Sequence, residues 1–428
     1  MIENGIKYSE DGKTLLEVLE KNMSNIAIPY SVTSIGEFAF DNCSSLVSID
    51  IPNSVKRIGG MAFNRCTSLV SIDIPNSVTS IGTAAFKGCT SLVSINIPNS
   101  VEMFGKRVFE GCTSLKNIKI PNSVTEISEC TFRLCTSLVS IDIPNSVTSI
   151  GTAAFKGCTS LVSIDIPNSV EEIGESAFEG CTSLKNIKIP NSVTEIEDFA
   201  FEGCVSLANI DIPNSIEAIG ERVFGGCTLL SSITIPNSVE IIVGSSFYGC
   251  TSLTSINIPN SVILLEDSVF ESCTSLTSIN IPNSVKKIGK NVFKCCTSLA
   301  YIDIPNSVTE IGEKAFLGCS SLSNIVIPNS VTTIEGYVFS GCTSLTSITI
   351  PNSVLELYWS VFMNCTSLKS IHFLAKSLDY IEISKNAFDG LSIDECTLFI
   401  PSGTRWAYRH HPILGKFKNI EIDKGIEN

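Results

Sequence analysis

The chain has 428 residues, a formal net charge of −14 and a pI near 4.8, and 43% of its residues are hydrophobic. The negative charge argues against nucleic-acid partners, because phosphate binding needs Lys and Arg to replace counterions, and it also disfavours an anionic membrane surface. The hydrophobic content suffices for a packed core and excludes wholesale disorder.

The N-terminal segment MIENGIKYSEDGKTLLEVLEK carries no apolar region of the kind found in signal peptides. Asp11-Gly12 within it is a turn signal. No later stretch approaches the ~18 apolar residues of a membrane span. We therefore expect a soluble chain without a transmembrane segment.

A 23-residue repeat fills most of the chain. Three residue types recur at this step in fifteen consecutive repeats without an insertion or deletion: Pro over 29–351, Cys over 43–365 and Phe over 40–362. So strict a period predicts a solenoid, in which each repeat is too small to bury its own core and stacks on its neighbours.

Each repeat predicts one strand and one turn. The pattern L-x-x-I-x-I-P, as in 161–167, predicts a strand with both isoleucines on one face, ended by a proline that has no N–H to donate. The segment G-x-x-A-F-x-x-C predicts a short helical or 3₁₀ turn on the opposite side. Eight positions should form the core: Leu, Ile, Ile, Val, Ile, Ala, Phe and Cys. Strands stacked at about 4.8 Å would form a parallel sheet, and the bulkier turns should place that sheet on the concave side.

The full pattern L-x-x-I-x-I-P-x-S-V-x-x-I-G-x-x-A-F-x-x-C resembles the BspA-like class of leucine-rich repeats, over about residues 25–372. The resemblance implies an α/β repeat solenoid, a right-handed superhelix with a parallel β-sheet on the concave face and short helical or 3₁₀ turns on the convex face. It also implies that residues 1–24 form an N-terminal capping hairpin. Residues 373–428 would form a degenerate last repeat and a C-terminal cap, with a last strand ending at Pro401.

The same resemblance implies a role but no chemistry. Many members of this class are surface proteins of bacteria and parasitic protists that bind host proteins, and the class carries no catalytic residues. It implies a location at the cell surface or outside the cell. The absence of an export signal or wall anchor in this sequence leaves a cytoplasmic location as the alternative.

The fifteen ladder cysteines allow three interpretations. Neighbouring repeats could bring thiols within disulfide distance, but the number is odd and identical rotamers would point the same way. Metal sites favour clusters such as C-x-x-C, which do not occur. The preferred interpretation is that each cysteine is a small buried hydrophobic residue with a weak S–H donor. Cys130, Cys295 and Cys396 lie off the ladder.

Catalysis has little support in the sequence. The three histidines are His372, His410 and His411, and the last two fall in the C-terminal segment, where a solvated surface is expected. No nucleophile elbow, phosphate-binding loop, zinc-protease motif or dinucleotide fingerprint occurs. We expect no enzymatic activity, no cofactor and no metal.

The exposed residue between the two strand isoleucines is the best candidate for partner binding. This column is mostly acidic in its first half, has two basic steps, and is accompanied by a single aromatic residue. The candidate residues are Asp50, Asp73, Lys119, Asp142, Asp165, Lys188, Asp211 and Tyr301. Binding hot spots favour Trp, Tyr and Arg, so loose multivalent contact fits this face better than one tight site. A plain solvated sheet face is the alternative.

Large apolar residues on the turn side are a second candidate. Tyr358-Trp359 is the most unusual pair, because the consensus has small residues there. A partner patch and local packing of the turns are both compatible with it. We therefore expect a monomeric, non-enzymatic protein that binds protein partners, of adhesion type, or alternatively an intracellular interaction scaffold.

Overall fold

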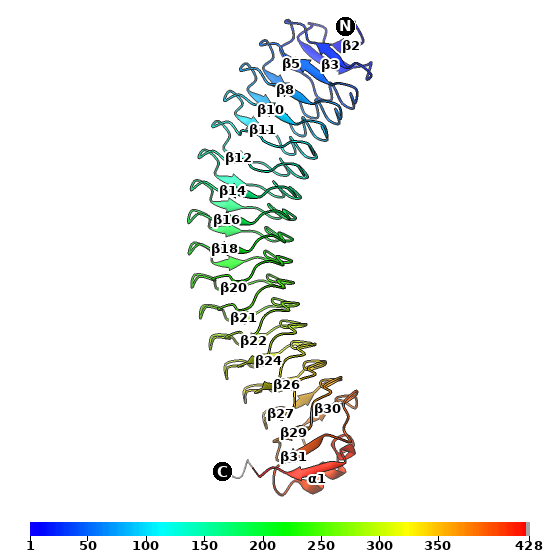
Figure 1. Cartoon of the computed structure of the whole chain (residues 1–428), viewed down its shortest axis with the longest axis vertical. Coiled ribbons are helices and arrows are strands. Elements are labelled where there is room, and N and C mark those ends of the chain that lie inside the picture. Colours follow the sequence, from blue (N-terminus) through cyan, green and yellow to red (C-terminus); the bar gives the residue numbers. More distant parts are fainter. Residues whose placement is uncertain (425–428) are drawn as a thin grey trace. The chain divides into compact units, whose positions relative to one another are not determined.

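The structure is a computed structural model, and it describes residues 1–424. The chain divides into two compact units, residues 1–216 (unit 1) and residues 217–428 (unit 2). Each unit is a stack of similar coils, coloured blue to green in unit 1 and green to red in unit 2 (Figure 1). The expected solenoid of stacked parallel strands is confirmed.

Most coils carry two short strands rather than the one predicted. One strand lies just before the proline, and the sheets it forms are called proline-side sheets. The other lies just before the glycine of the I-G pair and forms glycine-side sheets. In both, a residue pairs with its equivalent 23 positions later, as Ile164 does with Ile187. The sequence did not predict the second strand, because a strand of two residues is too short to show an alternation of hydrophobic and polar side chains.

Unit 1 contains both kinds of sheet. The proline-side strands are β4 (Asn25–Ala27), β6 (Ser48–Asp50), β8 (Ser71–Asp73), β10 (Ser94–Asn96), β14 (Ser163–Asp165), β16 (Asn186–Lys188) and β18 (Asn209–Asp211). The glycine-side strands are β5 (Ser34–Ile35), β7 (Arg57–Ile58), β9 (Ser80–Ile81), β11 (Met103–Phe104), β12 (Glu126–Ile127), β13 (Ser149–Ile150), β15 (Glu172–Ile173) and β17 (Glu195–Ile196). At the N-terminus, β1 (Ile2–Glu3), β2 (Ile6–Tyr8) and β3 (Thr14–Val18) pair antiparallel, and β3 then pairs parallel with β5.

Unit 2 repeats this arrangement. Its glycine-side strands are β19 (Ala218–Ile219), β20 (Ile241–Ile242), β21 (Leu264–Leu265), β22 (Lys287–Ile288), β24 (Glu310–Ile311), β26 (Thr333–Ile334), β28 (Glu356–Leu357) and β30 (Glu382–Ile383). Its other strands are β23 (Tyr301–Ile302), β25 (Asn324–Ile325), β27 (Ser347–Ile350), β29 (Ser370–Phe373), β31 (Thr397–Ile400) and β32 (Asn419–Ile422). Helix α1 (Arg405–His410) and the 3₁₀ helix η1 (Leu414–Lys416) lie between β31 and β32.

The turns opposite the strands are not helical, which corrects the expectation of a helical or 3₁₀ face. Within residues 1–424 the only helices are α1 and η1. Each turn instead has left-handed residues, such as Ala153 (φ 52°) and Gly157 (φ 73°), which break a helical backbone. Alternate N–H groups donate to the next repeat, from Phe155 to the Ala177 carbonyl at 2.8 Å for example. The turns are therefore bonded between coils. The right-handed superhelix and the concave position of the sheet stay predictions.

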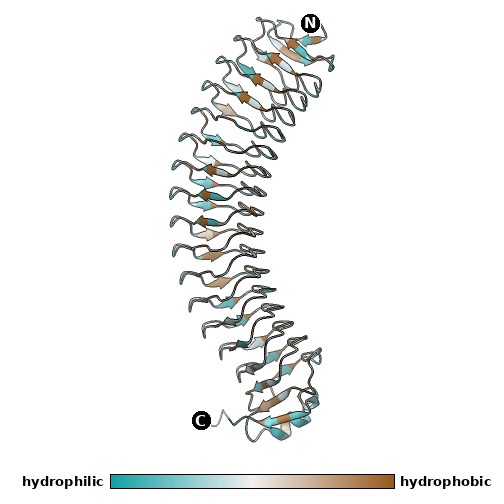
Figure 2. Cartoon of the chain, in the orientation of Figure 1, coloured by the Kyte–Doolittle hydropathy of each residue, from teal (hydrophilic) through white to brown (hydrophobic). Residues whose placement is uncertain are grey.

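The eight expected core positions are buried. In the repeat around Phe155 they include Val147, Ile150, Ala154 and Cys158, all with an exposed fraction of 0%. The phenylalanines form a stack within each unit, with neighbouring rings nearly parallel, for example at 5.4 Å and 4° for Phe155–Phe178. Figure 2 colours each residue by its hydropathy, and the strands carry both hydrophobic and hydrophilic residues. The core therefore lies between the strands and the turns of every coil.

The glycine after the second strand allows the coils to approach closely. A Cβ on Gly82 would lie 2.5 Å from the backbone nitrogen of Gly60, and one on Gly105 would lie 2.3 Å from that of Thr83. No side chain fits at such distances without a shift of the backbone. The recurring I-G pair thus reflects backbone packing between repeats.

The C-terminal coils are tied by a buried tyrosine. Tyr408 of α1 donates its hydroxyl hydrogen bond to the carbonyl oxygens of Ala375 (2.8 Å) and Phe373 (3.2 Å). Burial raises the pKa of this phenol well above its ordinary value. The tyrosine therefore fixes α1 onto the coil that precedes it.

Candidate functional site

Exposed charges of unit 1 line up on the proline-side sheet. Asp165, Lys188 and Asp211 pair in register across β14, β16 and β18, while the isoleucine beside each is buried. Backbone bridges extend the alignment from Asp165 to Asp142 and on to Lys119. These five residues, called the charged row, lie on adjacent coils about 4.8 Å apart. All five are exposed, and none forms an ion pair within 4.0 Å with another residue of 1–424, so their charges are available to a partner.

Exposed valines lie on two of the coils that carry the charged row. Val139 and Val162 are 46% and 38% exposed, and the Val162 N–H donates to the Val139 carbonyl at 3.1 Å, so the two are neighbours. Equivalent valines recur nearer the N-terminus: Val47, Val70 and Val93. We call these five residues the valine ridge. The proline-side face of unit 1 thus combines exposed apolar side chains with charges.

Asp50 and Asp73 lie on the same kind of face, outside the charged row. Asp50 pairs with Ala27, and Asp73 pairs with Asn96. Both carboxylates are exposed. They add negative charge beside the valine ridge.

Tyr301 is separated from those residues in the chain, because it belongs to unit 2. It is 54% exposed and pairs with Asn324 across β23 and β25. The neighbouring exposed positions of unit 2 are mainly Ser, Thr and Asn. The aromatic side chain therefore stands in a polar, largely uncharged surface.

Tyr358 and Trp359 follow β28 and pack locally. Their rings meet edge to face, with centroids 5.3 Å apart. The indole covers Gly336 of the preceding repeat so closely that a Cβ there would lie 2.5 Å from the ring nitrogen of Trp359. Glu356 and Glu335 raise the pKa of the Tyr358 phenol. Of the two earlier interpretations, this geometry favours packing for Trp359, although 41% of that residue stays exposed.

The cysteine ladder offers no reactive thiol. None of the eighteen cysteines is in a disulfide, and Cys295 alone is not fully buried. A ladder thiol donates to the carbonyl of the preceding repeat's phenylalanine, as from Cys158 to Phe132 at 3.1 Å. Burial raises the pKa of Cys158 to about 12, so the thiol stays protonated at neutral pH. The interpretation as buried hydrophobic residues is confirmed.

Sequence reasoning missed a groove along the glycine-side sheet of unit 1. It has a volume of about 760 Å³ and runs over Gly59, Gly82 and Gly105, with Arg57 and Met103 among its walls. The signal was present in the sequence, because a column of glycines leaves bare backbone as the floor. In its wall the Ser128 hydroxyl donates a hydrogen bond to the Glu126 carboxylate at 2.7 Å.

The corresponding face of unit 2 is acidic. A groove of about 560 Å³ there is lined by Glu313, Glu335 and Glu356 together with Lys290. Burial, followed by repulsion from Glu313 and Glu356, raises the pKa of Glu335. Within residues 1–424 no group of three or more His, Cys, Asp or Glu side chains is arranged to hold a metal ion.

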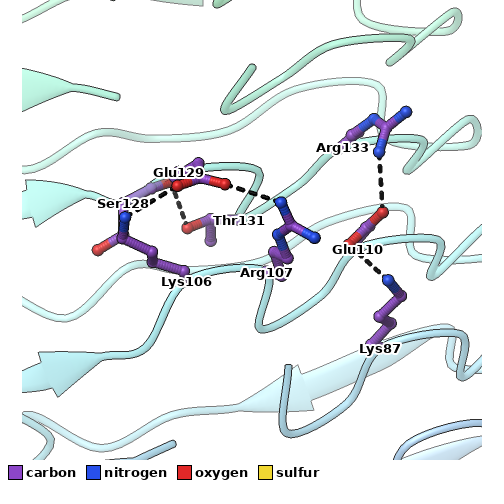
Figure 3. Close-up of polar contacts among 8 residues, drawn as sticks. All are labelled: Lys87, Lys106, Arg107, Glu110, Ser128, Glu129, Thr131 and Arg133. Atoms are coloured by element: carbon purple, nitrogen blue, oxygen red, sulfur yellow. Dashed lines mark hydrogen bonds and ion pairs between the residues drawn. The ribbon is translucent and has the colours of Figure 1, made fainter. Parts of the chain in front are cut away.

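Ion pairs link successive turns of unit 1 (Figure 3). Glu110 lies between Lys87 and Arg133, at 3.0 and 3.1 Å, and the Lys87 contact is an ionic one without hydrogen-bond geometry. Glu129 lies between Lys106 (2.8 Å) and Arg107 (2.9 Å). Each pair joins side chains one repeat apart, so the network stabilises the stack.

The histidines are engaged in the C-terminal coils. The Nδ1 atom of His372 lies 2.5 Å from an Asp423 carboxylate oxygen, and its ring stacks on Phe399 at 4.7 Å. His410 stacks on Trp406. Burial lowers the pKa of His411. None of these contacts brings a nucleophile to a base.

The described part of the chain also has no helix long and apolar enough to cross a bilayer.

Comparison with known proteins matches this geometry to bacterial repeat proteins. The family model for the BspA-type leucine-rich repeat region matches residues 19–139, 104–231, 217–342 and 286–405. A leucine-rich repeat protein from Bacteroides ovatus is 36% identical, with a TM-score of 0.74 over 82% of this chain and 95% of that one. A leucine-rich cell surface protein from Faecalibacterium prausnitzii is 26% identical, with a TM-score of 0.52 over 92% and 97%. No curated protein matches the chain.

Proposed function

The chain belongs to the BspA-type leucine-rich repeat family, and from that premise we propose that it is a non-enzymatic, surface-associated protein of adhesion type that binds a protein partner through the proline-side face of unit 1. Proteins of this family are in general protein-binding repeat proteins. The observation that carries the proposal is that two ridge valines, Val139 and Val162, lie exposed on the coils that carry Asp142 and Asp165 of the charged row.

The chemistry of this face suits a protein partner. Exposed valines supply apolar area to bury, and charges beside them set register and suppress wrong partners. Because the row reads plus, minus, minus, plus, minus from Lys119 to Asp211, the complementary partner surface would carry the opposite charges in the same order. Repetition over several coils allows weak contacts to add through avidity. The chain acts as a monomer in this proposal.

A charge-reversal experiment tests the face. The row variant replaces Asp142, Asp165 and Asp211 with Lys. The control variant replaces Glu171, Glu175 and Glu195 with Lys, which makes the same change of net charge at exposed positions outside the row. Both are measured by surface biosensor against a panel of purified extracellular-matrix proteins. We expect the wild-type chain and the control to bind one member and the row variant to lose that binding. Equal binding by both variants would contradict the proposal.

The surface location is supported by the Faecalibacterium protein, which is described as a cell surface protein. An antibody to this chain should label intact cells of its source without permeabilisation. The lack of disulfides among the eighteen cysteines favours the alternative, an intracellular interaction scaffold, because thiols persist in a reducing compartment. Labelling that appears only after permeabilisation would support the scaffold and contradict the surface assignment.

A further inference from the structure

A shallow polar trough lies beside the proline-side face of unit 2, where the strand ends and the proline turn begins. Its volume is about 460 Å³ and it spans successive repeats. Asn280 and Asp303 form one wall, and Asn260, Asn283 and Asn306 form the other. These five residues are called the amide trough. Prolines, among them Pro282 and Pro305, lie between the walls.

The backbone holds both walls in place. Asn280 and Asp303 are joined by a parallel bridge. Each proline turn is closed by a hydrogen bond, from the Val285 N–H to the Pro282 carbonyl at 3.0 Å in one repeat, and Ser284 donates to the Val262 carbonyl at 2.6 Å. The serine therefore faces the neighbouring coil, and the asparagine before it is left exposed. The walls are positioned without using their own side chains.

The side chains of the amide trough have no partners among the described residues. No hydrogen bond is recorded from the side chain of any of the five, and all are exposed. Each amide offers two N–H donors and a carbonyl acceptor, and the carboxylate offers acceptors only. The lining contains no Lys or Arg, which disfavours phosphate, sulfate or nucleic acid. The trough therefore suits an uncharged ligand that is dense in both donors and acceptors.

Tyr301 adds an apolar surface next to the trough. It lies two residues before Asp303 on the same face of the strand, because the intervening Ile302 is buried. Its ring is 54% exposed and Val326, at the other end, is 60% exposed. An aromatic face beside hydrogen-bonding groups packs against the C–H face of a ring whose edges carry hydroxyl groups.

We propose that the amide trough together with Tyr301 binds a neutral carbohydrate chain. Vicinal hydroxyl groups donate and accept at once, as the asparagine amides require. Consecutive coils are about 4.8 Å apart, close to the length of one sugar residue, so a linear oligosaccharide meets an equivalent asparagine at each step. The prolines provide a dry floor, and Tyr301 stacks on one sugar ring. This site is independent of the protein-binding face of unit 1.

Unit 1 shows why the inference is confined to unit 2. Asp142, Asp165 and Lys188 occupy the positions that Asn280 and Asp303 occupy in the trough. The charged row of unit 1 carries a charge at each consecutive step of this column, whereas the trough carries one, Asp303, between Asn280 and Val326. Solvated charges cost more to desolvate against a neutral sugar than amides do, so the trough suits a neutral sugar better than the charged row does.

A glycan array screened with the labelled full-length chain tests the proposal, using neutral, sulfated and sialylated oligosaccharides side by side. The best neutral oligosaccharide is then titrated by calorimetry against Tyr301→Ala and Asn283→Ala/Asn306→Ala. The control is Asn145→Ala/Asn168→Ala, the equivalent exposed asparagines of unit 1. Loss of the tyrosine or of two amides should weaken binding about tenfold or more, while the control binds as the wild type does.

Several results would overturn the proposal. They are the absence of binding to every neutral glycan, a preference for sulfated or sialylated glycans, or equal weakening by the trough and control variants. Circular dichroism of each variant excludes unfolding as the cause, since exposed asparagines contribute little to stability. Failure of this test leaves the charge-reversal experiment on unit 1 unaffected, because the variants and the probes differ.

Discussion

The proline-side faces of the two units differ although the coils beneath them are the same. Unit 1 presents the valine ridge and the charged row, whereas unit 2 presents Ser, Thr and Asn with Tyr301. Below both faces lie the same buried isoleucines, the same phenylalanine stack and the same thiols. Core positions are held constant because each side chain packs against its copies in adjacent coils. Exposed positions are free of that constraint, so recognition can differ along one array.

The largest effect we expect is an alkaline loss of stability shared by both units. Burial raises the pKa of Cys158 in unit 1 and Cys273 in unit 2 to about 12. Unfolding returns such thiols to an ordinary pKa near 8.5. Above that pH the unfolded chain releases protons that the folded chain keeps, so stability falls by about 1.4 kcal/mol per pH unit for each thiol, up to about pH 12.

Urea unfolding between pH 7 and pH 10 measures this fall. The single variants Cys158→Ala and Cys273→Ala should each reduce the fall of the unfolding free energy with pH by about 1.4 kcal/mol per pH unit. A stability that stays flat over this range would show that the ladder thiols are not buried in their protonated form. A fall in stability confined to one unit would contradict the prediction that both units share the same buried thiols.

The phenylalanine stack should respond equally in the two units. Phe155→Ala and Phe293→Ala each remove a fully buried ring from between two stacked neighbours and should cost about 3–5 kcal/mol in the free energy of unfolding. Val162→Ala, on the exposed ridge, should change it by less than about 0.5 kcal/mol. Denaturant unfolding of all three compares them. A change within error for either phenylalanine would refute the core assignment.

Glycine substitutions separate close backbone packing from ordinary surface. Gly105→Ala in unit 1 places a Cβ 2.3 Å from the Thr83 nitrogen, and Gly312→Ala in unit 2 places one 2.7 Å from the Gly289 carbonyl carbon. Each should cost about 1–3 kcal/mol through displacement of the coils. Gly60→Ala is the control, since its Cβ would approach nothing closer than 3.4 Å. If Gly60→Ala loses as much stability in thermal unfolding as the other two variants do, the close backbone approach at Gly105 and Gly312 is contradicted.

The smallest predicted effect concerns ion pairs and should differ between the units. Glu110→Gln removes a carboxylate that is 8% exposed and lies between Lys87 and Arg133, and should cost about 1–2 kcal/mol. Glu310→Gln breaks the exposed pair with Lys287 and should cost less than about 0.5 kcal/mol, because water screens it. Unfolding at low and high salt measures both. A larger loss of stability in Glu310→Gln than in Glu110→Gln would contradict this prediction.

Much of the fold was predictable from particular residues. The eight apolar positions of the repeat are buried as expected, because a strict period places each on its own copy in the next coil. The ladder thiols are buried and form no disulfides, as their identical orientation implied. The second strand was not predictable, since Ser149 and Ile150 form a strand only by pairing with their equivalents in adjacent coils. The non-helical turn was missed for a related reason, because its N–H groups bond to another repeat.

The candidate binding residues were found one at a time, and only the structure arranged them. Asp165 and Lys188 become neighbours through register, whereas Tyr301 and Trp359 belong to a different unit and different faces. The amide trough escaped notice altogether, since Asn283 is an ordinary turn residue in sequence and acquires its walls from the coils on either side. The sequence by itself determined the period, the core and the absence of known catalytic motifs, because these depend on residue type and spacing alone. Tertiary structure decided which exposed side chains share a surface, because that depends on contacts between residues 23 positions apart.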